Sequence, residues 1–157
     1  MTYIHTQSFP VRYYECDSYG HVNHANYARY MVEAAFGASQ VAGYDNERLR
    51  EASAAWLARE HDITYLRPLV FGDTVTVRTW VADFRRVRSL RQYELYNQRE
   101  QLVATAHTDW IYINTATQYP ASIPESVIYA FHPHGAPVEA PRREPFPKPP
   151  PLCASGV

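Results

Sequence analysis

Residues 27–43 read YARYMVEAAFGASQVAG and decide the fold that we expect for this chain. Apolar side chains recur at helical spacing through the stretch, and Gly43 suits its end because glycine readily adopts the left-handed conformation there. Small side chains let a second backbone approach closely, so we expect a sheet that wraps around this helix. The small face is made of Ala34, Ala35, Gly37 and Ala38.

The chain after residue 55 changes from helical to alternating spacing. Three stretches, residues 74–81, 90–97 and 102–114, are rich in β-branched and aromatic side chains and alternate in polarity, which is typical of strands. Residues 97–100 are expected to join the last two as a hairpin. One long helix followed by consecutive antiparallel strands predicts an α+β fold, in contrast to alternating strand–helix units.

The two ends of the chain differ in character. Residues 6–14 read as a first strand, and residues 123–131 as a short helix that begins near a proline. Beyond residue 131, closely spaced prolines exclude a helix or a central strand. We therefore expect one domain over residues 1–131 and a Pro-rich tail over residues 132–157 that is disordered or extended.

The composition narrows the function classes. The 157 residues carry a net charge of -1, so nothing in the overall charge favours nucleic acid as a partner. The sequence contains neither a secretory signal nor a stretch of the length that a membrane-spanning helix needs, and we expect a cytoplasmic protein with no membrane partner. Cys16 and Cys153 lie far apart, and the histidines show no clear ligand spacing, so no metal and no cofactor is expected.

The densest group of chemically active side chains precedes the helix. Residues 13–27 read YYECDSYGHVNHANY, with the first part turn-like. A helix start offers unpaired backbone N–H groups that can stabilise an oxyanion, and a carboxylate held nearby can attack a thioester or activate water. Asp17 is the candidate carboxylate. Taken singly, Asp17 is equally explained as a turn former, and Asn23 or Asn26 as a helix cap.

The pattern D-x-x-G-H-V-N-H-A-N-Y, which begins at Asp17, resembles the active-site segment of the 4-hydroxybenzoyl-coenzyme A thioesterase group. Within that group the chain is most similar to the acyl-coenzyme A thioesterases associated with the Tol-Pal system. The resemblance covers residues 5–131 and continues through YLRP, FGD, WIYIN and YPASIP, which begin at residues 65, 71, 110 and 119.

This resemblance implies the hotdog fold, in which an antiparallel sheet of about five strands wraps a long central helix. It implies hydrolysis of acyl-coenzyme A or acyl-carrier thioesters, with Asp17 as nucleophile or general base, accompanied by Tyr13 and His24. It also implies a homodimer or homotetramer that shares active sites between protomers. The resemblance implies that the backbone amides near His24, Ala25, Asn26 and Tyr27 hold the thioester oxygen. The substrate-binding residues at the helix start are Asn23, Ala25, Asn26 and Tyr27.

A basic run, Arg85, Arg86, Arg88 and Arg91, lies between two predicted strands. Arginine forks match phosphate geometry, so Arg86 and Arg88 are candidates for binding the phosphates of coenzyme A. A solvated sheet edge explains the same residues equally well.

Two other residues compete with Asp17. Neighbouring residues on an extended segment point to opposite sides, so only one of Cys16 and Asp17 can face a pocket, and we expect Cys16 to be buried and inert. Glu33 on the helix is a second possible acid, but we expect it to form an ion pair with Arg29 one helical turn away.

Two other functions remain open from the sequence. The first is a hotdog module that binds acyl thioesters without cleaving them. The second is a hotdog hydratase or dehydratase, which needs differently placed acid and histidine pairs that the sequence does not show.

Overall fold

The structure of the protein is a computed structural model that describes residues 4–131. The elements follow one another in the order β1 (His5–Pro10), a 3-10 turn (Tyr13–Glu15), α1 (His24–Val41), α2 (Asn46–Glu51), β2 (Ala54–Tyr65), β3 (Thr74–Phe84), β4 (Arg88–Tyr96), β5 (Leu102–Asn114), β6 (Tyr119–Pro120) and α3 (Glu125–Phe131).

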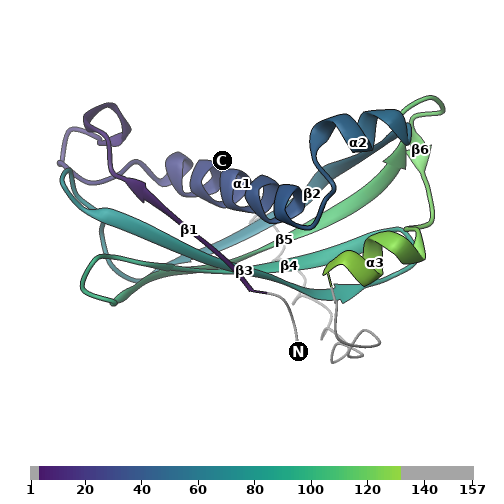
Figure 1. Ribbon diagram of the computed structural model, residues 1–157. Coiled ribbons are helices and arrows are strands. Elements are labelled where there is room, and N and C mark those ends of the chain that lie inside the picture. Colours follow the sequence, from purple (N-terminus) through teal and green to yellow (C-terminus); the bar gives the residue numbers. More distant parts are fainter. Residues whose placement is uncertain (1–3, 132–157) are drawn as a thin grey trace, which may run out of the picture.

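Five long strands form one antiparallel sheet in the order β1-β3-β4-β5-β2, and the two-residue β6 pairs with β5. The sheet is strongly curved, and α1 lies against its concave side (Figure 1). The loop before α1 lies at one end of the sheet, whereas α2, α3 and β6 lie at the other (Figure 1). This is the hotdog fold that the sequence predicts.

The small face of α1 explains how the helix can lie so close to the sheet. Ala34 and Ala38 have no exposed surface. A Cβ atom added to Gly37 would collide with the side chains of Gln7 and His5 on β1, and would lie 2.8 Å from Nε2 of His5. A larger side chain there would therefore force the side chains of Gln7 and His5 to move.

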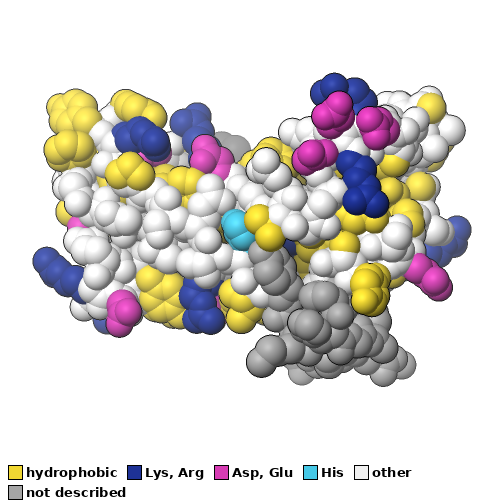
Figure 2. Space-filling view, in the orientation of Figure 1, with side chains coloured by type: hydrophobic (Ala, Val, Ile, Leu, Met, Phe, Trp, Pro, Cys, Tyr) yellow, Lys and Arg dark blue, Asp and Glu magenta, His cyan; other side chains and the backbone are white. Residues whose placement is uncertain are grey.

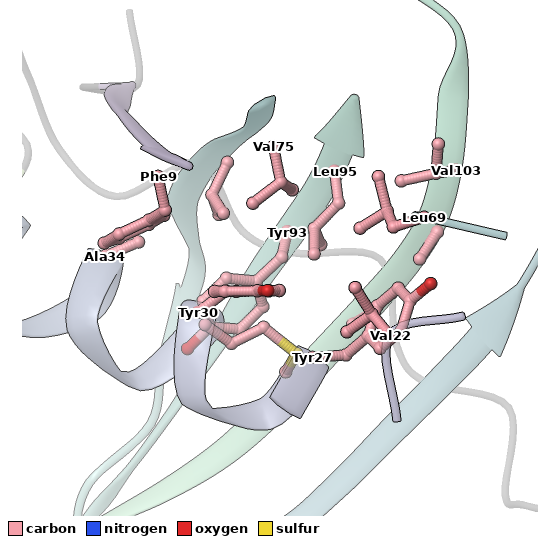
Figure 3. Close-up of a cluster of buried hydrophobic side chains, with 14 of the residues drawn as sticks. Phe9, Val22, Tyr27, Tyr30, Ala34, Leu69, Val75, Tyr93, Leu95 and Val103 are labelled. Atoms are coloured by element: carbon pink, nitrogen blue, oxygen red, sulfur yellow. The ribbon is translucent and has the colours of Figure 1, made fainter. Parts of the chain in front are cut away.

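The main core fills the space between the N-terminal half of α1 and the sheet. Figure 3 shows Tyr30 and Ala34 of α1 beside Phe9 of β1 and Tyr93 of β4. The rings of Phe9 and Tyr30 stack with their centroids 5.7 Å apart. Burial of these aromatic rings together with the aliphatic side chains around them stabilises this part of the protein.

The first predicted strand is shorter than expected. It ends at Pro10, and the chain then turns through Tyr13–Glu15. The carboxylate of Glu15 accepts a hydrogen bond of 2.7 Å from the backbone N–H of Arg12, and this bond closes the turn. Alternation of polarity alone does not predict this side-chain bond.

Other differences concern α2, β2 and one ion pair. Helix α2 was not predicted, and its N-cap Asp45 accepts a bond of 2.9 Å from the N–H of Arg48. Strand β2 begins at Ala54, one residue before the expected change to alternating spacing. The predicted pair between Arg29 and Glu33 does not form in the described structure, because the Arg29 guanidinium donates to Asn26 Oδ1 instead. The predicted tail, residues 132–157, lies outside the described residues.

Candidate active site

Asp17 lies in a tight turn that leads into α1. Cys16 and Val22 pair across the turn as an isolated antiparallel bridge, and Gly20 has a φ of +78°, which a glycine adopts without strain. One oxygen of Asp17, Oδ1, accepts hydrogen bonds from the backbone N–H groups of Tyr19 at 2.9 Å and His21 at 3.3 Å. The carboxylate is therefore held in one orientation while the side chain stays exposed.

Cys16 and Asp17 point in opposite directions, as expected for neighbouring extended residues. The Cys16 side chain is half-buried, packs against the main core, and its Sγ lies 3.8 Å from the carbonyl oxygen of Arg12. Asp17 faces outward. The thiol is thus turned away from the surface that the carboxylate faces.

Glu15 joins this turn to the start of α1. Its carbonyl oxygen accepts bonds from the N–H of Asn23 at 2.8 Å and from Nδ2 of Asn26 at 2.9 Å. Its carboxylate is buried and accepts a bond of 2.9 Å from the hydroxyl of Tyr30. Asp17 is two residues further along the chain, so these bonds fix where its turn lies relative to the helix start.

Glu15 was not among the residues selected from the sequence. The sequence feature that could have indicated Glu15 is the spacing of Asn26 and Tyr30, which lie four residues apart on one face of the helix. Both side chains bond to Glu15. Burial, and then the bond to Glu15, raise the pKa of the Tyr30 hydroxyl. This hydroxyl therefore stays protonated and acts as a donor.

The start of α1 offers the backbone N–H of His24 as an open donor. Asn23 is the N-cap, and its Oδ1 accepts a bond of 3.0 Å from the N–H of Ala25. The N–H of Asn26 bonds to the carbonyl of Asn23 at 2.9 Å. Within residues 4–131 no acceptor meets the N–H of His24, which lies at the positive end of the helix dipole.

Asn26 and Tyr27 are structural parts of this helix start. Both side chains are buried, and the side-chain amide of Asn26 is hydrogen-bonded to Glu15 and Arg29. Burial raises the pKa of Tyr27, whose ring meets that of Tyr65 edge to face at 4.9 Å. Their side chains hold the helix start in place and do not face solvent.

Tyr13 and His24 lie at the same end of the molecule as Asp17, but neither bonds to it within the described residues. Tyr13 is exposed, and its ring meets Phe71 edge to face at 5.9 Å. His24 is exposed, and its carbonyl accepts a bond of 3.2 Å from the hydroxyl of Tyr65. The structure therefore gathers the three predicted residues without forming a hydrogen-bonded triad.

Exposed aromatic rings surround this end of the chain. Tyr14, Tyr19 and Phe71 are all largely exposed, as is Tyr13. Figure 2 shows hydrophobic side chains gathered around the loop before α1, at the upper left. Such a group of exposed rings is typical of a surface that another molecule covers.

The predicted basic run lies at the opposite end of the sheet. Pro10 pairs with Thr74 at the start of β3, whereas Arg85 follows the end of that strand, roughly 30 Å away at about 3.3 Å per residue. Arg85 and Arg88 both contact the buried carboxylate of Asp109, Arg88 at 3.7 Å.

The other two arginines of the run have different surroundings. Arg86 is exposed, and its Nε lies 3.5 Å from the hydroxyl of Ser122. Arg91 is buried and points toward the concave side of the sheet. The run is therefore not one continuous basic surface, and it does not meet the Asp17 turn within a single chain.

Two further features bear on function. Among residues 4–131, no group of three or more His, Cys, Asp or Glu side chains could hold a metal ion. No helix in that range is both long and apolar enough to cross a membrane.

Comparison with known proteins gives several related thioesterases. The sequence model of the acyl-ACP thioesterase N-terminal domain matches residues 2–131. A Bacillus subtilis (strain 168) protein named "Putative acyl-CoA thioesterase YneP" is 25% identical over 75% of this chain and 86% of its own length. The crystal structure of a DHNA-CoA thioesterase from Staphylococcus aureus has a TM-score of 0.72 and 25% identity, covering 76% of this chain and 80% of the other.

The plant relatives are longer proteins. The chloroplast palmitoyl-acyl carrier protein thioesterase of Cuphea hookeriana is 22% identical over 83% of this chain, which spans only 33% of the plant protein. The match of the family model covers all of the described residues. The chain therefore belongs to the acyl-ACP thioesterase N-terminal domain family and is a hotdog-fold thioesterase.

Proposed function

We propose that this protein hydrolyses acyl-coenzyme A or acyl-carrier thioesters to a free acid and a thiol, and that Asp17 is the reacting carboxylate. The observation that carries this proposal is the pairing of two features at one place. The open N–H of His24 and the positive end of the α1 dipole lie beside a turn that holds Asp17 in a fixed orientation.

The thioester carbonyl oxygen accepts a hydrogen bond from the N–H of His24 in this proposal. As negative charge develops on that oxygen, the N–H group and the helix dipole stabilise it. The neighbouring amides of Ala25, Asn26 and Tyr27 contribute through the dipole, since the N–H groups of Ala25 and Asn26 already have acceptors. Asn23 keeps the helix start in shape as its N-cap.

Asp17 can act in two ways, and both balance. As a general base, its free oxygen takes a proton from water while the water oxygen attacks the acyl carbon; the carbon–sulfur bond then breaks, and the proton passes to the leaving thiolate. As a nucleophile, the same oxygen attacks the acyl carbon and the thiolate leaves, taking a proton from solvent; water then hydrolyses the anhydride to the free acid and restores the Asp17 carboxylate. His24 and Tyr13, exposed at the same end, orient the water or the carboxylate.

A second copy of the chain completes the site in this proposal. Asp17 and the aromatic rings around it are exposed in the single chain, whereas acyl transfer favours a site from which bulk water is excluded. Arg86 and Arg88 lie at the far end of β3, so they bind substrate phosphates at an Asp17 site only when a second protomer brings them there. A homodimer or homotetramer and a cytoplasmic location stay predictions.

A thioester-binding module that does not cleave its ligand is the second candidate. The bonds from Tyr19 and His21 to Asp17 Oδ1 favour it, because a purely structural turn would make the same bonds. Release of free thiol from a panel of acyl-coenzyme A and acyl-carrier thioesters separates the two functions. Turnover supports hydrolysis; saturable binding with no thiol release from any thioester contradicts it.

A further inference from the structure

Three arginines converge on one buried carboxylate where strands β4, β5 and β2 run side by side. The carboxylate is that of Asp109 on β5, which is only 1% exposed. Nη2 of Arg85, just after β3, lies 2.5 Å from its Oδ1. Nη1 of Arg59 on β2 and Nη1 of Arg88 on β4 lie 3.5 Å and 3.7 Å from its Oδ2. We call these three residues the arginine cluster; they place their guanidinium groups around a single point.

Arg85 alone meets the needs of the buried Asp109 carboxylate. Such a carboxylate requires an opposite charge and a hydrogen bond, and Nη2 of Arg85 supplies both. Arg85 also lies 3.5 Å from Asp83, whereas Arg59 and Arg88 contact no second carboxylate within residues 4–131. Three guanidinium groups thus share two carboxylates, and the cluster carries a surplus of positive charge.

The surplus charge is open to the surface. The exposed fractions of the side chains are 50%, 39% and 36% for Arg59, Arg85 and Arg88. Each guanidinium has several N–H donors, and only one or two of them point to a carboxylate. Glu60 lies on β2 opposite the buried carboxylate, but it contacts His107 at 4.0 Å and not the cluster. Most donors of the cluster therefore remain available to an anion.

Protection of a sheet edge does not explain this cluster. Exposed charges at an edge keep strands of other molecules from pairing there, yet Arg88 lies on β4, an inner strand of the sheet. An ordinary ion pair has a simpler form in this protein, since Arg78 and Glu94 pair one to one at 3.5 Å. Three guanidinium groups anchored at one point are held in place before an anion arrives, which lowers the cost of binding it.

We propose that the arginine cluster binds the diphosphate group of a ligand. Guanidinium forks match phosphate oxygens in geometry and charge, and a diphosphate has enough oxygens and negative charge for three of them. Coenzyme A contains such a group, and free inorganic diphosphate has the same chemistry. The proposal adds Arg59 and Arg85 to Arg88 as phosphate-binding residues. It rests on the proposed function only if coenzyme A is the ligand.

Inorganic pyrophosphate and coenzyme A are the probes, and isothermal titration calorimetry of the full chain gives their Kd. We expect coenzyme A to displace pyrophosphate, and pantetheine, which lacks phosphate, to leave it bound. Arg59→Met should weaken pyrophosphate binding by about 10- to 100-fold, the range for loss of a hydrogen bond to a charged group. Arg59→Lys keeps the charge but loses the fork, so its affinity should lie between those of the wild type and Arg59→Met.

Arg78→Met is the matched control, because it removes the same charge from a side chain that is 43% exposed on β3 and pairs with Glu94. It should bind pyrophosphate as the wild type does. Arg88→Met decides should Arg59→Met fail to fold, because Arg88 makes the longest of the three contacts with Asp109. It should weaken pyrophosphate binding by a similar factor, and the Tm of each variant reports its folding.

The inference is overturned by absence of saturable pyrophosphate binding, or by an unchanged affinity in folded Arg59→Met or, in its place, Arg88→Met. An equal loss in Arg78→Met would also overturn it, because net charge alone would then explain the binding. Displacement by coenzyme A identifies coenzyme A as the source of the diphosphate, and failure to displace identifies free diphosphate. The titrations contain no thioester, so their failure leaves the proposed hydrolysis intact, and absence of thiol release leaves the diphosphate site intact.

Discussion

Replacement of Tyr30 by Phe tests the link between α1 and the turn that carries Asp17. The substitution removes one hydroxyl, which donates a bond of 2.9 Å to the carboxylate of Glu15. Both side chains are buried, and the ring of Tyr30 keeps its contacts with Phe9 and Tyr27 in the variant. The expected effect therefore comes from the lost hydrogen bond alone.

The size of the effect follows from the charge of the acceptor. A hydrogen bond to a charged group contributes about 1.5–3 kcal/mol to the free energy of unfolding, and its loss leaves a buried carboxylate with one bond fewer. For a chain of this size, each kcal/mol lowers Tm by roughly 2–4 °C. Tyr30→Phe should therefore lower Tm by roughly 3–12 °C.

Tyr93→Phe is the matched control for this experiment. Tyr93 is also buried, but its hydroxyl has no hydrogen-bond partner within residues 4–131. Its removal should leave Tm unchanged or raise it, because an unpaired buried hydroxyl costs stability. Differential scanning calorimetry of both variants gives the comparison. A drop in Tm of equal size in the two would refute the bond to Glu15 as the source of the effect.

Three further predictions concern stability. Burial raises the pKa of Tyr27 and Tyr30, so both tyrosines ionise first in the unfolded chain as the pH rises. Their contribution to stability is therefore fully present below pH 10 and is lost at higher pH. Urea unfolding above pH 10 should show a fall in the free energy of unfolding that is smaller in Tyr30→Phe. Asp109→Asn leaves the guanidinium groups of Arg59, Arg85 and Arg88 without the carboxylate between them, and should lower the free energy of unfolding by about 2–3 kcal/mol in urea titrations. The control Arg59→Met removes one half-exposed partner and should lower it by less than about 1 kcal/mol. Gly37→Val should lower Tm because its side chain collides with those of Gln7 and His5, and an unchanged Tm would show that these two side chains move aside at no cost.

Much of the fold could be predicted because its signals are local and periodic. The small residues Ala34, Ala35, Gly37 and Ala38 indicated a helix that a sheet approaches closely. The alternation in residues 102–114 matched β5 from end to end. Helix α2 was missed because it is short and depends on a single cap at Asp45. The 3-10 turn was missed because a side-chain bond, invisible to periodicity, closes it.

The candidate site was only partly predictable. The sequence placed Asp17 beside the start of α1, because the two are neighbours in the chain. It missed Glu15, whose role depends on side chains from the helix, and the contact of Arg59 with Asp109, which lie on neighbouring strands but far apart in the sequence. The four arginines looked alike in the sequence, yet the contacts with Asp109 and Thr79 give them different environments.

The most direct test of the account is thiol release by Asp17→Asn. Asparagine has the same shape, and its Oδ1 can accept the bonds from Tyr19 and His21, so the turn persists while the charge and the reacting oxygen are lost. On a thioester that the wild type hydrolyses, we predict a fall in kcat of about 100-fold or more with an unchanged Tm. Wild-type turnover by Asp17→Asn would show that the side chain only shapes the turn, and would contradict the proposed mechanism.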